Sequence, residues 1–139
     1  MCEVQNMGQA LSRSESREVA FRLIFAMGNG TAYDGDAWHL ALDGKTAPAP
    51  EKQYIEQIVN TFADLRAKID QQISENLQKW TLDRLRQTDL AVLRLAAAEM
   101  MLGTVPTPVI INEAINLAKK YGDAQSGGFV NGLLAKLAE

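Results

Sequence analysis

Residues 88–102 read TDLAVLRLAAAEMML and are the most informative stretch of the chain. A helix over these residues is apolar on nearly every side, so we expect it to lie centrally and to be packed by other helices all round. Thr88 is placed to cap its start, and Gly103 is placed to end it. Arg94 and Glu99 lie within this apolar helix, where a charge is costly unless it is paired.

The next helix is expected after the hinge at residues 106–108, which reads Pro-Thr-Pro. Thr107 would cap it, Pro108 would occupy its first position, and Gly122 would end it. Asn112 and Glu113 lie among apolar residues in its first half. We expect a structural network of ion pairs and hydrogen bonds between helices, formed by Arg94, Glu99, Asn112 and Glu113. The alternative is that these groups contact a ligand.

Apolar residues also recur every three or four positions elsewhere, which predicts further helices and no strand. The first is capped by Ser14 or Ser16 and ends at residues 28–30, Gly-Asn-Gly. Others cover residues 36–42, residues 51–78 without interruption, residues 82–86 behind a Thr81 cap, and the stretch that begins at Gln125 or Ser126. We therefore expect an all-α fold of six or seven helices, with residues 1–12 as a flexible tail and residues 13–139 as one domain.

The composition excludes several classes of protein. Hydrophobic residues make up 47% of the chain, which is enough for a core, and the net charge of -3 argues against binding nucleic acid by bulk electrostatics. A local basic patch is still compatible with this charge. Cys2 is the only cysteine, so no internal disulfide forms. Residues 1–9 lack the apolar core of a signal peptide, and the apolar stretch at 90–102 is too short to span a bilayer. We expect a soluble, cytoplasmic protein.

No convincing catalytic or metal-binding pattern is present in the sequence. His39 is the only histidine, and no cluster of cysteines or carboxylates surrounds it, so we expect a surface or packing role. The Gly-Asn-Gly at 28–30 is followed by Tyr33 where a dinucleotide-binding motif requires glycine. The Ser-Gly-Gly at 126–128 lacks the lysine and the spacing of a phosphate-binding loop. We therefore expect a protein that is not an enzyme and that needs neither a cofactor nor a metal ion.

Six short motifs follow one another in a recognisable order. They are Arg17, Ala20, Ile24 and Phe25 in the first helix; Trp80 before Leu82 and Arg84; LRLA at 93–96 followed by Glu99-Met100; INEA at 111–114; LAK at 117–119; and FVNG at 129–132. Together they resemble the NusB family of transcription antitermination factors. The resemblance covers residues 13–134 and is weak at residues 29–50.

The resemblance implies two packed helical subdomains and an adaptor without enzymatic activity. Proteins of this family bind boxA-type single-stranded RNA together with NusE, a ribosomal protein, and act on transcribing RNA polymerase during ribosomal RNA synthesis. Their RNA contacts use an arginine-rich N-terminal segment and the start of the last helix, which correspond here to Arg13, Arg17, Gln125, Ser126 and Phe129. Phe129 has two open interpretations, stacking on a base or filling the core.

The resemblance also assigns Phe25 and Asp89 to positions that matter for NusE, and an acidic residue there suits a basic ribosomal protein. The chain departs from the family at residues 13–17, which read Arg-Ser-Glu-Ser-Arg and contain only two cations. Fewer phosphate contacts predict weak RNA binding by the isolated protein, with NusE supplying much of the affinity. The alternatives are a helical protein-interaction scaffold that has lost RNA binding, and the detached RNA-binding domain of a ribosomal RNA methyltransferase.

Overall fold

A computed structural model describes residues 10–78 and 81–139, so Trp80 and residues 1–9 of the predicted tail at 1–12 lie outside the described residues. The elements in chain order are α2 (Arg13–Gly28), α3 (Gly35–Leu42), α4 (Ala49–Glu75), the 3-10 helix η1 (Leu82–Arg84), α5 (Gln87–Leu102), α6 (Thr107–Tyr121) and α7 (Ser126–Leu137). Within the described residues the only β-type pairing is one isolated bridge between Ala10 and Thr46. The all-α prediction is confirmed.

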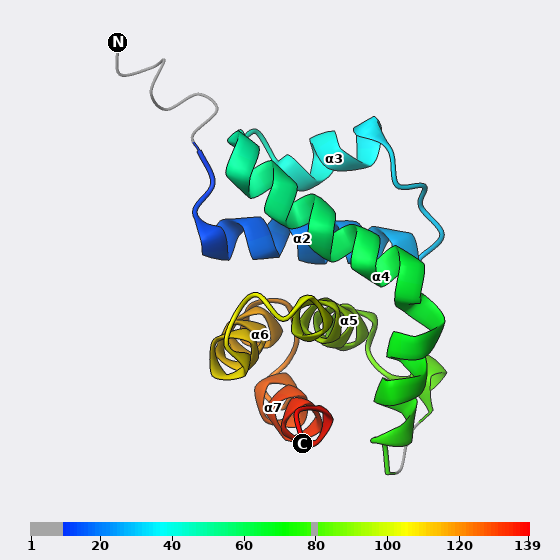
Figure 1. Cartoon of the computed structure of the whole chain (residues 1–139). Coiled ribbons are helices and arrows are strands. Elements are labelled where there is room, and N and C mark those ends of the chain that lie inside the picture. The colour runs from blue at the N-terminus through cyan, green and yellow to red at the C-terminus, as the bar shows by residue number, and fades with distance from the viewer. Residues whose placement is uncertain (1–9, 79–80) are drawn as a thin grey trace.

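The helices form two groups that α4 connects (Figure 1). α2, α3 and the first part of α4 lie together, and α5, α6 and α7 form the other group, while the second part of α4 extends alongside the latter. α4 and α5 pack against each other more extensively than any other pair of elements. Over the described parts of the chain, no helix combines the length and the apolar character needed to cross a membrane.

α5 is the central helix, as its sequence predicts. Every residue from position 89 to position 99 is buried, because α2, α4, α6 and α7 all pack against it. Gly103 ends the helix in the left-handed conformation. Because α5 is buried on all sides over these eleven residues, it fixes the positions of the surrounding helices. Arg94 and Glu99 lie within this buried stretch, where a charge is tolerated only if it is paired.

α4 is not the straight helix that its apolar spacing predicts. It ends at Glu75 rather than near residue 78, and Leu65 interrupts it with φ -114° and ψ 21°. Before the kink the buried stripe includes Ile58 and Phe62, and after it the stripe continues at Ile69 and Ile73, whereas Leu65 is 39% exposed. The kink lets one helix bury its apolar side against two differently oriented groups of neighbours.

The helix starts also differ from the prediction. Ser12, not Ser14 or Ser16, caps α2: its hydroxyl accepts the N–H of Glu15 at 3.1 Å, and the Glu15 carboxylate accepts the N–H of Ser12 at 2.9 Å. This reciprocal pair is a capping box. Leu11 is buried and its N–H donates to the carbonyl of Thr46, so packing begins inside the segment that we expected to be a tail.

Two threonines that we expected to be caps lie inside their helices. Thr88 and Thr107 fall in the first turns of α5 and α6, and the cap positions are taken by Arg86 and Pro106, neither of which makes a side-chain cap bond. The Thr88 hydroxyl is buried without a hydrogen-bond partner among the described residues. At both helix starts, backbone geometry and packing therefore outweigh the preference of threonine for the cap position.

Candidate nucleic-acid interface

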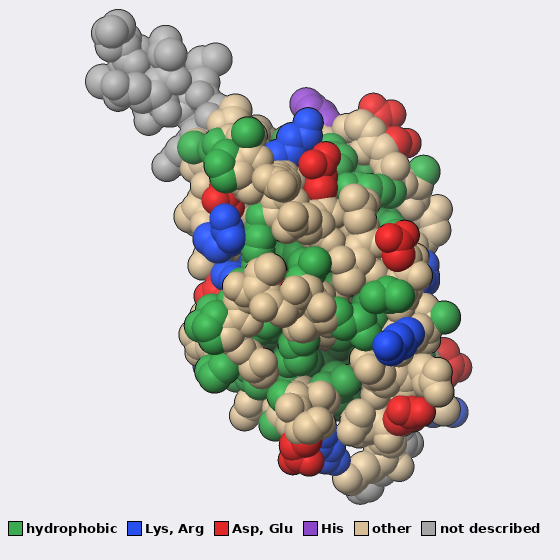
Figure 2. All heavy atoms as spheres, in the orientation of Figure 1, with side chains coloured by type: hydrophobic (Ala, Val, Ile, Leu, Met, Phe, Trp, Pro, Cys, Tyr) green, Lys and Arg blue, Asp and Glu red, His purple; other side chains and the backbone are tan. Residues whose placement is uncertain are grey.

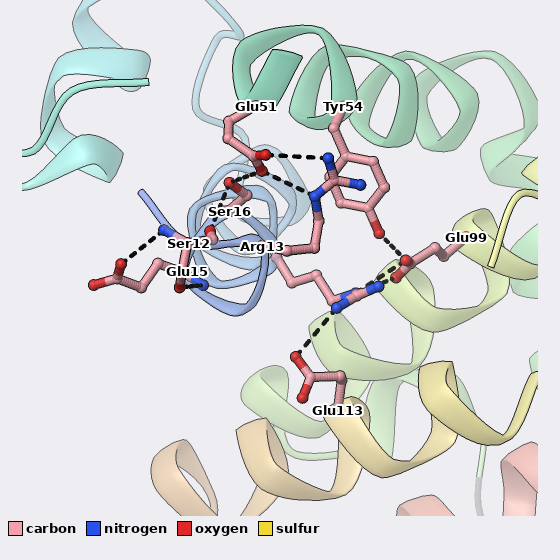
Figure 3. A network of polar contacts seen from close by, with 9 residues as sticks. Ser12, Arg13, Glu15, Ser16, Glu51, Tyr54, Glu99 and Glu113 are labelled. Carbon is pink, nitrogen blue, oxygen red and sulfur yellow. Dashed lines mark hydrogen bonds and ion pairs between the residues drawn. The ribbon is translucent and has the colours of Figure 1, made fainter. Parts of the chain in front are cut away.

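Arg17 lies in the interior and joins three helices. Its Nε atom lies 2.9 Å and 3.1 Å from the two carboxylate oxygens of Glu99 on α5, and its Nη1 atom lies 3.2 Å from Glu113 on α6. Only 6% of Arg17 and 1% of Glu99 is exposed. Tyr54 of α4 donates its hydroxyl to the same Glu99 carboxylate, which adds a fourth helix (Figure 3).

The Glu99 carboxylate is desolvated, and this burial raises its pKa above the ordinary value of 4.5, although Arg17 acts in the opposite direction. A buried charge that lost its partner would be strongly destabilising. Arg17 therefore has a structural role in this fold. The family resemblance led us to expect a phosphate contact from Arg17, but its guanidinium is already engaged by two carboxylates.

The predicted polar network exists, but its membership differs from the prediction. Arg94 does not pair with Glu99 or Glu113; its Nε and Nη2 atoms each lie 2.9 Å from the carboxylate of Asp70 on α4. Asn112 is exposed and makes no side-chain hydrogen bond within the described residues, so it does not belong to the network. The charges are held in two separate clusters, one around Glu99 and one around Asp70.

The Arg94–Asp70 pair also touches the end of α2. A Cβ atom placed on Gly28 would lie 2.7 Å from Nη1 of Arg94, so only glycine fits there without displacing the guanidinium. Arg94 is 7% exposed and its position over the Phe62 ring, 5.5 Å from the centroid, leaves it little freedom. This cluster connects α2, α4 and α5.

Arg13, unlike Arg17, lies at the surface, with 45% of its side chain exposed. Its guanidinium lies 3.9 Å from the centroid of the Tyr54 ring and forms a two-bond pair with the Glu51 carboxylate. Arg13 and Tyr54 also line an open hollow of about 340 Å³ together with Gln53, Gln57 and Thr104. Arg13 and Arg17 are thus four residues apart but have different environments.

The other predicted RNA contacts gather at the start of α7. A hollow of about 230 Å³ is lined by four residues from the turn and start of α7 and by four from the chain before and at the start of α5. They are Asp123, Gln125, Ser126 and Phe129, and Arg84, Leu85, Arg86 and Asp89. Both arginines are exposed. Sequence reasoning missed them as site residues, although two cations directly before the central helix were a usable signal.

Ser126 shapes this hollow from within. It is 1% exposed, and its hydroxyl accepts the N–H of Asp123 at 3.0 Å and lies 3.2 Å from the Asp123 carboxylate. A Cβ atom on Gly122 would lie 2.2 Å from the Ser126 hydroxyl oxygen, so the turn between α6 and α7 closes tightly. Gln125 is exposed, as are Asp123 and Ala124 before it, so this part of the turn faces solvent.

Phe129 fills part of the core, which was one of its two interpretations, and stacking on a base stays a prediction. It packs against the core and is half-buried, and its exposed part lines the hollow with Arg84. It also lines a second hollow, of about 320 Å³, with Leu77 and Lys136. An aromatic ring fixed on one side by the core and open on the other is suited to stacking.

Asp89 lies in the same hollow as the predicted RNA contacts. It is 8% exposed, its Oδ1 atom has no hydrogen-bond partner in the described part of the chain, and burial raises its pKa above the ordinary value. Phe25, the other residue expected to meet a protein partner, is half-buried on α2 beside Phe21 and does not line this hollow.

Comparisons with known proteins agree with the fold. The family model described as the NusB family matches residues 14–139. The transcription antitermination protein NusB of Bacillus licheniformis is 39% identical over 128 residues, which cover 91% of this chain and 96% of that protein. The one from Agathobacter rectalis is 38% identical over 131 residues, with coverages of 92% and 100%.

Solved structures give the same result. T. maritima NusB superimposes with a TM-score of 0.83 at 33% identity, covering 94% of this chain and 92% of that one. A chain from the crystal structure of the antitermination factors NusB and NusE in complex with dsRNA superimposes with a TM-score of 0.80 at 26% identity, covering 90% and 94%.

Proposed function

Since the chain belongs to the NusB family, we propose that it acts in the cytoplasm as an antitermination adaptor that binds boxA-type single-stranded RNA together with NusE. The pair would act on RNA polymerase during ribosomal RNA synthesis. The protein is not an enzyme, in keeping with relatives that are named as antitermination proteins.

The observation that carries this proposal is the hollow at the start of α7. It combines an aromatic side chain, Phe129, with an exposed amide, Gln125, and two exposed cations, Arg84 and Arg86, of which Arg86 is paired with Asp123 in the same hollow. Single-stranded RNA is bound by stacking unpaired bases on aromatic rings, by hydrogen bonds to base edges and by cations that meet phosphates. All three kinds of group are present within one hollow.

Arg13 is the second RNA contact that we propose, at the opposite end of α5. That helix has 16 residues, so its ends lie about 24 Å apart. Arg13 and Val105, which follows the end of α5, line one hollow, while Asp89 in its first turn lines the other. An extended RNA strand that contacts both regions would be held at two separated points.

Phe25 and Asp89 are the residues that we propose for NusE. Asp89 lies beside the proposed RNA contacts, and its negative charge suits a basic ribosomal protein. Because its Oδ1 atom is buried, the partner would contact the exposed rim of this hollow. RNA and NusE would then meet at one place, which gives a physical reason for cooperative binding.

The test is a titration of boxA-type RNA and of a scrambled RNA of equal length, with and without the NusE of the same organism, at low and moderate salt. We expect NusE to increase the affinity for the boxA-type RNA much more than for the scrambled one. If the chain binds NusE but gains no RNA affinity, the protein-interaction scaffold is the correct reading. If neither ligand binds, both readings are wrong.

A further inference from the structure

The cations around the start of α2 are held by carboxylates. Lys45 pairs with Glu15, Arg22 and Lys120 pair with Glu18, and Arg13 pairs with Glu51. On the face drawn in Figure 2, basic and acidic side chains accordingly alternate and no broad area carries one sign of charge. This part of the molecule contains the residues for phosphate binding, yet their charges are already compensated.

The Arg13–Glu51 pair has the geometry that an arginine adopts with a phosphate. Nε of Arg13 lies 2.9 Å from one Glu51 oxygen, and Nη2 lies 3.1 Å from the other. Carboxylates and phosphates take up the same two parallel N–H donors of a guanidinium. A phosphate that approached this edge of Arg13 would find both donors occupied.

Both members of the pair are positioned by other groups. The Ser16 hydroxyl donates to Glu51 at 2.7 Å, and the Tyr54 ring packs against the Arg13 guanidinium (Figure 3). The hydrogen bonds from Arg13 and then from Ser16 hold the pKa of the Glu51 carboxyl below its ordinary value, so it keeps its negative charge even in mild acid. With 45% of the Arg13 side chain exposed, however, solvent weakens the attraction and a ligand can reach it.

We propose that Glu51 is an internal competitor of RNA for Arg13, so that this carboxylate sets the RNA affinity of the protein. The inference rests on the proposed function, because it assigns Arg13 to a phosphate. On binding, a phosphate takes the two donors of Arg13, while Glu51 keeps its bond from Ser16 and Arg13 stays on the Tyr54 ring. RNA therefore binds by exchanging one anion for another at a guanidinium that is already in place.

The test compares Glu51→Gln with the unchanged protein, both bound to NusE, in titrations with boxA-type RNA over a range of salt concentrations. Glutamine keeps the size of the side chain and removes its charge. We expect the affinity to rise about two- to fivefold at low salt, the size of an exposed charge pair. The logarithm of affinity should also fall more steeply with the logarithm of salt, by about 0.7. In the unchanged protein the freed Glu51 carboxylate takes up a cation and offsets the cation that the phosphate releases, whereas glutamine takes up none.

Glu56→Gln is the matched control, since it removes the same charge from the same helix and Glu56 makes no ion pair in the described residues. Arg13→Gln, alone and combined with Glu51→Gln, completes the comparison. The gain from Glu51→Gln should vanish when Arg13 is absent. Thermal unfolding and NusE affinity should stay close to those of the unchanged protein in each variant.

Three results would overturn the inference while leaving the proposed function intact. They are a gain that persists without Arg13, an equal gain in Glu56→Gln, and a loss of RNA affinity in Glu51→Gln, which would mean that Glu51 orients Arg13 for RNA. If the unchanged protein shows no selective RNA binding even with NusE, the proposed function and this inference are both wrong.

Discussion

At the scale of the residue, Arg17 is the side chain whose removal should have the largest effect. Arg17→Ala leaves Glu99 buried without its cation and should cost about 3–5 kcal/mol of unfolding free energy, measured by urea denaturation. Arg17→Lys should lose less unfolding free energy, because lysine keeps the positive charge. Some loss remains, because lysine lacks the planar guanidinium that bonds two carboxylates at once. A stable Arg17→Ala variant that had lost only RNA affinity would show that Arg17 contacts RNA directly.

Glu15 should make the protein sensitive to acid. Its hydrogen bond with Lys45, and then its bond from the Ser12 N–H, lower its pKa from 4.5 to about 2. The folded chain thus holds this proton less tightly than the unfolded chain, so the stabilisation is full above pH 4.5 and is lost as the pH falls through 2. Thermal melts between these pH values should show a shallower decline for Glu15→Gln, and an unchanged slope would contradict this.

Glu99 has the opposite dependence. Burial raises its pKa, so the folded chain holds this proton more tightly and Glu99 favours folding at low pH. That contribution is lost as the pH rises from 4.5 through the raised pKa. The defect of Arg17→Ala should therefore be smaller in acid, where Glu99 is protonated, than at neutral pH.

Sequence reasoning identified most of the charged residues of the network but not their partners. A charge on an apolar helix needs a partner, which is why Arg94, Glu99 and Glu113 could be predicted to form pairs. Nothing in the pattern tells that Arg17 or Asp70 is the partner, because 82 residues separate Arg17 from Glu99 and 24 separate Asp70 from Arg94. Those choices depend on how α2 and α4 cross α5.

At the scale of the element, the turn between α6 and α7 determines where the proposed RNA contacts lie. Gly122→Ala would force a Cβ atom against the Ser126 hydroxyl, so we expect a loss of about 1–3 kcal/mol of unfolding free energy and weaker RNA binding. Gly128→Ala is the control on α7, since its Cβ would meet nothing within 4 Å and helix propensity should stabilise it by about 0.5–1 kcal/mol. Equal effects in urea denaturation would contradict this account of the turn.

The spacing of apolar residues predicted which segments form helices, but it did not predict where the helices bend or begin. The stripe along α4 was predicted, but the kink at Leu65 was not, because no glycine or proline marks it. The start of α2 was missed by two residues or more, although Ser12 and Glu15 have the spacing of a capping box, because three serines competed for the position. Packing against neighbours settles such details.

At the scale of the whole molecule, the two groups of helices should unfold together. The cluster around Glu99 connects α2, α4, α5 and α6, and α5 is buried against both groups. Urea transitions followed by circular dichroism and by tryptophan fluorescence should therefore coincide, as in a two-state protein. Two separate midpoints would mean that the two groups of helices unfold independently.

The all-α fold class was predictable because it depends on the spacing of apolar residues every three or four positions, and this spacing recurs in most of the segments predicted to be helical.

The central position of α5 has a consequence for the order of events during translation. α6 and α7, which cover it on one side, follow it in the chain. A nascent polypeptide therefore presents an apolar helix to solvent from the moment that segment leaves the ribosome until α7 has followed it. Pauses in synthesis between residues 103 and 137 would prolong that exposure, and the newborn chain would then be most vulnerable to aggregation and most dependent on chaperones.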